Sequence, residues 1–163
     1  MAPYSVLITG ANRGMGLGLV KYFLKDKDIQ HVIATAREPS SAKELNEITD
    51  MRLTVLKLDV TSDESIDELY SQVSICRKDR RSAKLSMLQS ALNSIMKTMS
   101  VDLAPEHILV AMFCPGWVKT DMGGPNAHLQ IEESMEQLVP SMYKLTKEHH
   151  GGYFNRDLTA IAF

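Results

Sequence analysis

The sequence has few cysteines, few aromatic residues and no excess of charge of either sign. Its two cysteines, Cys76 and Cys114, are too few for a disulfide framework and favour free thiols in a reducing, cytosolic setting. The 18 Lys and Arg residues are balanced by 20 Asp and Glu residues, whereas a dedicated nucleic-acid or anionic-membrane binder needs a strong basic excess. We therefore expect a cytoplasmic protein without a nucleic-acid or membrane partner.

Long apolar runs and the marks of a leader sequence are also missing. No stretch approaches the roughly 18 apolar residues that a membrane span requires, and Met1–Ser5 lacks the charged start of a signal peptide. A chain of 163 residues fits one domain, and a domain of this size buries roughly 70% of the surface of its unfolded chain. We expect residues 1–163 to form a single soluble domain.

Strand and helix patterns alternate in the first half of the chain. Val6–Ile8 and His31–Ala36 are short, continuous apolar runs of the kind found in buried strands, and Arg52–Val60 contains a third β-rich run. Apolar residues at helical spacing follow the first run, and patterns that cap helices begin at Ser41 and Thr61. The alternation predicts an α/β domain with a parallel sheet.

The second half begins with a basic segment and a long amphipathic pattern. Arg77–Lys84 contains five basic residues in eight, which we interpret as a solvated connector rather than a nucleic-acid patch. Apolar residues in Leu85–Leu103 recur every three or four positions and predict one long helix. Its apolar stripe suits either the core of the chain or the interface of a homo-oligomer, and both interpretations stay open.

Further elements are predicted towards the end of the sequence. His107–Phe113 is another apolar run typical of a buried strand. A helix is predicted from about Ile131 with an interruption at Pro140, and Gly151–Phe154 indicates a last short strand.

A glycine-rich segment, Thr9–Gly18, lies between the first strand and the first helix. Gly10, Gly14 and Gly16 allow a sharp turn and a close approach of the backbone to a pyrophosphate. The helix beginning near Gly14 presents its unpaired N–H groups and positive dipole end to the anion. The Gly-x-x-x-Gly-x-Gly spacing differs from the general Gly-x-Gly-x-x-Gly fingerprint, and a tight turn without a ligand is the alternative interpretation.

The end of the second strand bears on the choice of cofactor. An acidic residue there would bind the ribose 2′-hydroxyl of NAD, whereas an arginine accommodates the 2′-phosphate of NADP. The sequence has Arg37 at this place, and Arg13 in the glycine turn supplies a second positive charge. These residues favour NADP(H) over NAD(H). The alternative is that Arg37 is only a solvated loop residue.

Three motifs in this order resemble those of the short-chain dehydrogenase/reductase family: the Thr9–Gly16 turn, Leu58–Thr61 after the third strand, and Pro115–Asp121. The C-factor or carbonyl-reductase-like branch is the most similar sub-group, since it also has a stretch similar to Gly151–Asp157. The resemblance implies a Rossmann-like, doubly wound parallel sheet. It also implies an oxidoreductase that binds NADP and reduces a small carbonyl substrate.

The same resemblance implies roles along the cofactor. Asp59 would bind the adenine amino group while Val60 flanks the ring, and the main chain of Pro115–Val118 with the Thr120 hydroxyl would hold the nicotinamide end. The full set of cofactor-binding residues that we predict is Gly10, Asn12, Arg13, Gly14, Met15, Gly16, Arg37, Asp59, Val60, Pro115, Gly116, Val118 and Thr120.

The chain departs from the family where the chemistry takes place. The family uses a tyrosine as proton donor, a lysine one turn later and a serine on a preceding strand. Alignment of the helices places Leu85 and Gln89 at the tyrosine and lysine positions. The two central strands of the family sheet are absent, so the predicted fold lacks them and no catalytic residue is predicted. Removing them exposes an edge of the first strand. Either the His107–Phe113 strand fills this place through a right-handed crossover, or apolar strand edges stay open and the product aggregates.

Two further patterns are interpreted as coincidence. Tyr143 and Lys147 have the spacing of the catalytic pair but follow the Pro-Gly motif, in a segment that the family uses as a lid. His149 and His150 are interpreted as a helix end, since no further ligands follow at zinc spacing.

The sequence therefore supports three hypotheses about function. The chain is an NADP(H)-dependent carbonyl reductase with impaired activity, or a catalytically silent protein that binds NADP(H) or a partner. The third hypothesis is an incomplete product of splicing or gene prediction with no function of its own. We expect NADPH binding that is weak or absent, and no measurable carbonyl reduction.

Overall fold

The computed structural model describes residues 3–76, 90–105 and 107–162. The chain divides into two compact units: Tyr4–Arg81, called the N-terminal unit below, and Ser82–Phe163 with Met1–Pro3, called the C-terminal unit. The single domain over residues 1–163 stays a prediction. The predicted connector and the aligned Leu85 and Gln89 lie outside the described residues.

The N-terminal unit is built on a three-stranded parallel sheet. The strands are β1 (Ser5–Ile8), β2 (His31–Ala36) and β3 (Leu53–Lys57), in the order β1-β2-β3. The middle strand β2 is buried from its second residue to its last, as a strand covered on both faces must be. The parallel sheet is thus confirmed, with β2 at its predicted bounds.

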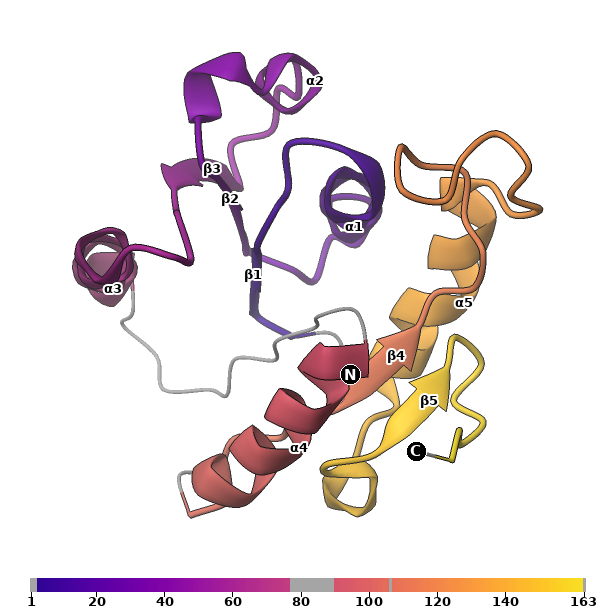
Figure 1. The fold of residues 1–163 in the computed structure, drawn as a ribbon. Coiled ribbons are helices and arrows are strands. Elements are labelled where there is room, and N and C mark those ends of the chain that lie inside the picture. Colours follow the sequence, from indigo (N-terminus) through magenta and orange to yellow (C-terminus); the bar gives the residue numbers. More distant parts are fainter. Residues whose placement is uncertain (1–2, 77–89, 106, 163) are drawn as a thin grey trace. The chain divides into compact units, whose positions relative to one another are not determined.

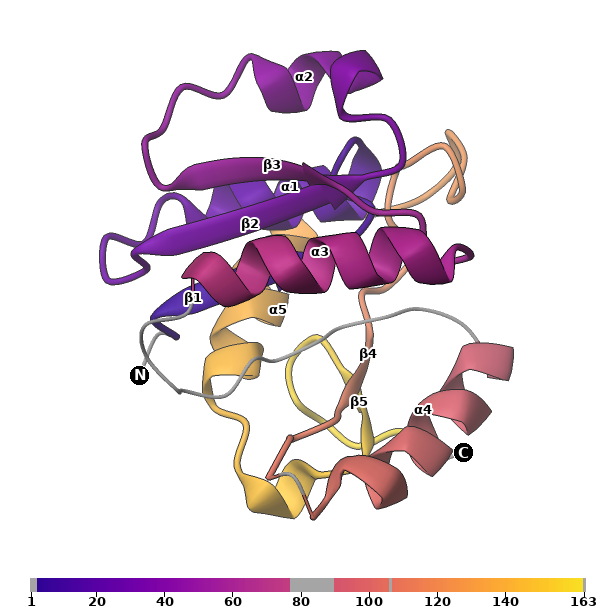
Figure 2. The same cartoon turned by 90° about the vertical axis from the view of Figure 1, so that its left-hand side faces the viewer.

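Helices cover both faces of this sheet. Figures 1 and 2 show α1 (Gly14–Phe23) on one face and α3 (Asp63–Cys76) on the other. The short elements η1 (Pro39–Ser41) and α2 (Lys43–Asn46) connect β2 to β3. This doubly wound, Rossmann-like arrangement confirms the predicted fold class, in a sheet of few strands.

Both predicted helix caps are displaced by one residue. The residue before α2 is Ala42, because Ser41 belongs to the preceding 3-10 turn and its hydroxyl donates to the Glu38 carbonyl at 2.9 Å. Ser62, not Thr61, caps α3, since its Oγ accepts from the backbone N–H of Ser65 at 3.2 Å.

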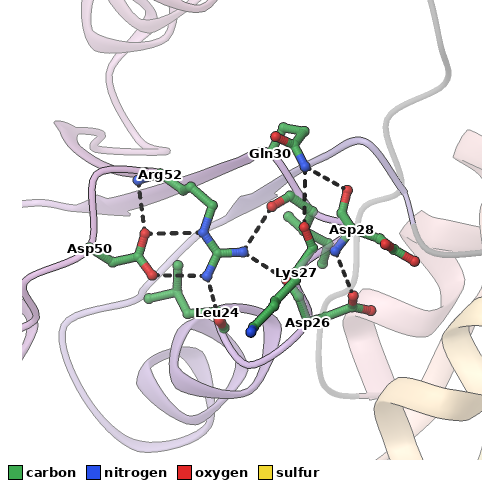
Figure 3. A network of polar contacts seen from close by, with 8 residues as sticks. Leu24, Asp26, Lys27, Asp28, Gln30, Asp50 and Arg52 are labelled. Atoms are coloured by element: carbon green, nitrogen blue, oxygen red, sulfur yellow. Dashed lines mark hydrogen bonds and ion pairs between the residues drawn. The ribbon is translucent and has the colours of Figure 1, made fainter.

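A polar network around Arg52 joins the end of α1 to the amino ends of β2 and β3 (Figure 3). The Arg52 guanidinium donates to the backbone carbonyls of Leu24, Asp26 and Ile29, which lie between α1 and β2. It also pairs with Asp50, with 2.9 Å between Nη2 and Oδ2. The Arg52 hydrogen bonds lower the pKa of Asp50 from its ordinary value. One side chain thus fixes the loop that leads into β2.

The C-terminal unit contains a two-stranded parallel sheet of β4 (Met112–Cys114) and β5 (Tyr153–Asn155). The helices α4 (Ser90–Leu103) and α5 (Ile131–Tyr143) lie on opposite sides of it (Figures 1 and 2). Its core includes Met96, Val110 and Met112, against which Met99 and Leu103 of α4 pack. Among the described residues, no helix is long and apolar enough to cross a membrane.

Two predictions in this unit need correction. The strand predicted over His107–Phe113 is shorter, because Val110 bonds to the chain before β5: its N–H donates to Nδ1 of His150, and its carbonyl accepts from Gly151. Within its own unit, the strand β4 pairs with β5. Pro140 lies inside α5 without ending it, because the buried Leu138 and Val139 hold the helix against the core.

Candidate nucleotide site

The glycine turn has the geometry that its spacing predicts. Gly10 and Gly14 adopt φ angles of 63° and 54°, which other residues rarely tolerate. A Cβ atom at Gly16 would overlap the carbonyl oxygen of Gly10, so the first turn of α1 packs directly on the end of β1. Ala11 is fully buried and its N–H donates to the Thr35 carbonyl at 2.9 Å. The turn is therefore fixed to the carboxyl end of β2.

A pocket of about 580 Å³ opens beside this turn, which is a usual size for a ligand site. The residues that line it are Asn12, Arg13, Ala36, Arg37, Glu38, Ser41, Lys57 and Asp59. Four of them belong to the predicted site, and they come from the segments that follow three neighbouring strands. The pocket therefore lies at the carboxyl ends of parallel strands, where open α/β sheets bind their ligands.

The pocket has an excess of positive charge. Three of its side chains are cationic (Arg13, Arg37 and Lys57), and two are acidic (Glu38 and Asp59). Each cation comes from the end of a different strand of the sheet. An excess of one positive charge at the open end of a sheet favours an anionic ligand.

Asp59 is held in place by hydrogen bonds from the residues that follow it. Its Oδ1 accepts from the backbone N–H and from the hydroxyl of Thr61, at 3.0 and 2.7 Å. These Thr61 bonds, and then the charges of Arg37 and Lys57, lower the pKa of Asp59. Val60 beside it is 57% exposed, so an apolar side chain lies open at this edge.

The remaining predicted residues lie in the C-terminal unit, where their own packing explains them. The Pro115 carbonyl accepts from the buried Ser134 hydroxyl at 2.8 Å. Gly116 has a φ of 82°, and a side chain there would overlap Arg156. Val118 is buried, and Oγ1 of Thr120 accepts from the N–H of Gly123. A nicotinamide-binding role for these residues stays a prediction.

Sequence reasoning missed four of the pocket residues, namely Ala36, Glu38, Ser41 and Lys57. Lys57 is the last residue of β3 and pairs in register with Ala36, the residue before Arg37. Apolar patterns locate strands but do not give the register between parallel neighbours. Lys57 lies inside the predicted Arg52–Val60 run, so the sequence did not mark it as the end of a strand.

The patterns interpreted as coincidence have structural explanations. Tyr143 is the last residue of α5, and Lys147 opens the separate 3-10 turn η2 (Lys147–His149), so helical spacing does not align them. Nδ1 of His149 accepts from the N–H of Thr146. Within the described part of the chain, no three His, Cys, Asp or Glu residues gather as a metal site.

A family model and a curated relative each match only part of the chain. Residues 4–76 match the family model described as short chain dehydrogenase. The C-signal protein of Myxococcus xanthus is 39% identical over 75 residues, which are 46% of this chain and 45% of that protein. The chain thus aligns with less than half the length of this curated relative.

Solved structures match along the whole chain. The carbonyl reductase Sniffer of D. melanogaster is 25% identical with a TM-score of 0.89, over 99% of this chain and 100% of that chain. The NADPH-bound carbonyl reductase from chicken fatty liver shares the fold with a TM-score of 0.89 at 20% identity, over 100% of both chains.

The chain is shorter than a relative that it matches from end to end. An uncharacterized oxidoreductase of Schizosaccharomyces pombe is 27% identical over 245 aligned positions, covering 96% of each protein. Because this chain has 163 residues, at least 82 of the 245 positions have no counterpart in it. With the glycine turn and the parallel sheet, these matches make the chain similar to the carbonyl-reductase-like branch of the short-chain dehydrogenase/reductase family.

Proposed function

We propose that this chain binds NADP(H) in the pocket of the N-terminal unit and that its carbonyl reduction is impaired. The observation that supports binding is the positively charged pocket beside a glycine turn, at the carboxyl ends of three parallel strands. A dinucleotide with an additional phosphate matches this charge better than one without it.

The residues present fit the adenosine end of the cofactor. Arg13 and Arg37 would hold the 2′-phosphate, and the amides at the start of α1 would hold the pyrophosphate. Oδ1 of Asp59 already accepts two bonds from Thr61, so Oδ2 would accept from the adenine amino group. When bound, NADPH supplies a hydride for a carbonyl carbon.

Proton transfer is the step that this chain's residues do not support. Leu85 and Gln89 stand at the positions aligned with the family's tyrosine and lysine. Leucine cannot donate a proton, and glutamine has no charge to lower the pKa of a neighbouring acid. A bound carbonyl would therefore lack a proton for its developing oxyanion.

Two other functions are kept as alternatives. A protein that binds NADP(H) or a partner without turnover is favoured by a match to the family model that ends at residue 76. An incomplete splicing or gene-prediction product without function is the other alternative, and a flat response to NADPH up to millimolar concentration would favour it.

A thermal-shift titration with NADPH up to millimolar concentration tests the proposal, because a ligand held by the native state raises its melting temperature. We expect a rise for the natural chain and none for Arg37→Glu. A flat response of the natural chain would refute NADP(H) binding. Oxidation of NADPH by a reactive diketone, abolished by the same substitution, would refute the impaired chemistry.

A further inference from the structure

We infer that Lys57 selects NADP(H) over NAD(H), by supplying the charge that makes the pocket positive. This inference rests on the proposed NADP(H) binding and adds a specificity-determining residue to it. Sequence motifs point to Arg13 and Arg37 for this task, whereas Lys57 emerges only from the arrangement of β3 beside β2.

The register of the sheet places Lys57 next to the two arginines. Lys57 pairs with Ala36, and the N–H of Leu58 donates to the Ala36 carbonyl at 2.9 Å. Neighbouring parallel strands lie about 4.8 Å apart, so the residue that ends β3 stands beside the one that precedes Arg37. Ala36, the partner of Lys57 in register, itself lines the pocket. Lys57 accordingly lines the same pocket as Arg37.

The electrostatics of the neighbouring acid support this placement. Asp59 lies two residues after Lys57 and lines the same pocket. After the hydrogen bonds from Thr61, the charges of Arg37 and Lys57 both lower the pKa of Asp59. The ammonium group is thus close enough to the pocket's anionic side to act on a ligand there.

A count of charges gives Lys57 its importance. With Lys57, three cationic side chains oppose two acidic ones; without it, two oppose two and the pocket is neutral. A phosphate monoester carries about −1.5 to −2 charges at pH 7, whereas the ribose 2′-hydroxyl that it replaces carries none. Removing one cation therefore weakens binding of the nucleotide with a 2′-phosphate. Binding of the nucleotide with a 2′-hydroxyl is nearly unaffected.

The test uses fragments of the cofactor that lack nicotinamide, so it does not depend on chemistry. Dissociation constants of the full-length chain are measured by calorimetry for adenosine 2′,5′-diphosphate and for adenosine 5′-monophosphate. The variants are Lys57→Gln, Lys57→Glu and Lys57→Arg. Lys27→Gln is the matched control, because Lys27 is exposed in the same unit but precedes β2 and lies outside the pocket.

We expect Lys57→Gln to reduce the preference for the 2′-phosphate about tenfold. An exposed charge pair contributes up to about a factor of five per unit charge, and the phosphate carries about −1.5 charges. Lys57→Glu should reduce it further, while Lys57→Arg and Lys27→Gln should keep it. All variants should melt at the temperature of the natural chain when no ligand is present.

The outcomes separate this inference from the proposed function. If the natural chain prefers the 2′-phosphate and Lys57→Gln keeps the full preference, the role of Lys57 is refuted and NADP(H) binding stands. If Lys57→Gln and Lys57→Arg lose the preference for the 2′-phosphate equally, Lys57 does not act through its charge. If the natural chain binds neither fragment and NADPH does not stabilise it, the proposed function itself fails.

Discussion

The two units of the chain differ in how their predicted cofactor residues are used. In the N-terminal unit, Asn12, Arg13, Arg37 and Asp59 converge on one pocket at the carboxyl ends of consecutive strands. In the C-terminal unit, Pro115, Gly116 and Thr120 take part in packing and turns of their own unit. The first group lines a pocket, and the second stabilises turns and packing within its own unit.

The difference reflects how a parallel sheet builds a site. The residues that follow neighbouring parallel strands lie at the same edge of the sheet, so one stretch of sequence, Asn12–Asp59, supplies the whole pocket. The proposed function assigns nucleotide binding to this stretch. It assigns the impaired chemistry to the part of the sequence where at least 82 positions of the aligned relative have no counterpart.

The largest expected effect comes from the glycine turn, on which the N-terminal unit depends. We expect Gly16→Ala to lower the free energy of unfolding by about 3 kcal/mol, because its Cβ would overlap the Gly10 carbonyl. Gly10→Ala meets no neighbour and should cost only about 1 kcal/mol, from its positive φ. Urea unfolding measures both. A smaller effect at Gly16 than at Gly10 would contradict the close packing of helix on strand.

The next effect concerns the polar network of Figure 3. We expect Arg52→Met to lower the free energy of unfolding by about 2–3 kcal/mol, because three backbone carbonyls lose their donor. Arg37→Met, an exposed arginine of the same unit, should change it by less than about 0.5 kcal/mol. Denaturation midpoints of the two variants provide the comparison, and equal midpoints would rule out the role of Arg52.

A third substitution tests whether nucleotide binding in the N-terminal unit is independent of the stability of the C-terminal unit. His150→Leu removes the acceptor of the Val110 N–H and the partner of the Ser100 carbonyl, 2.7 Å from Nε2. We expect a loss of about 1–2 kcal/mol in stability from the unpaired backbone groups. The rise in melting temperature with NADPH should be unchanged, because the pocket lies wholly in the N-terminal unit. Loss of that rise would contradict a self-contained nucleotide site.

The smallest effect is a dependence on pH. The pKa of Asp50 is lower in the folded chain than its unfolded value of about 3.9, so its stabilising effect is fully present above that value. The effect disappears as the pH falls through the lowered pKa. The urea midpoints of the natural chain and Asp50→Asn should therefore differ at pH 7 and converge below about pH 4. A difference that is as large at pH 3 would exclude ionisation of Asp50 as its cause.

Local sequence patterns predicted nearly all elements of the N-terminal unit. The features that they did not predict depend on how strands pair. The bounds of β2 and the start of α1 follow from a compact apolar run and from Gly14, which are visible without partners. Lys57 was not predicted as a pocket residue, because its position beside Ala36 depends on the register between β2 and β3. The strand over His107–Phe113 was made too long because apolar residues show burial, whereas a strand also needs a partner along its length.

We propose that the chain retains a nucleotide site like that of the short-chain dehydrogenases without their chemistry. Titration of the full-length chain with NADPH, followed by addition of a reactive diketone, tests both halves in one sample. Thermal stabilisation that saturates at up to millimolar NADPH, with constant absorbance at 340 nm after the diketone, is the expected result. Absence of stabilisation, or a fall in absorbance that Arg37→Glu abolishes, would contradict the account.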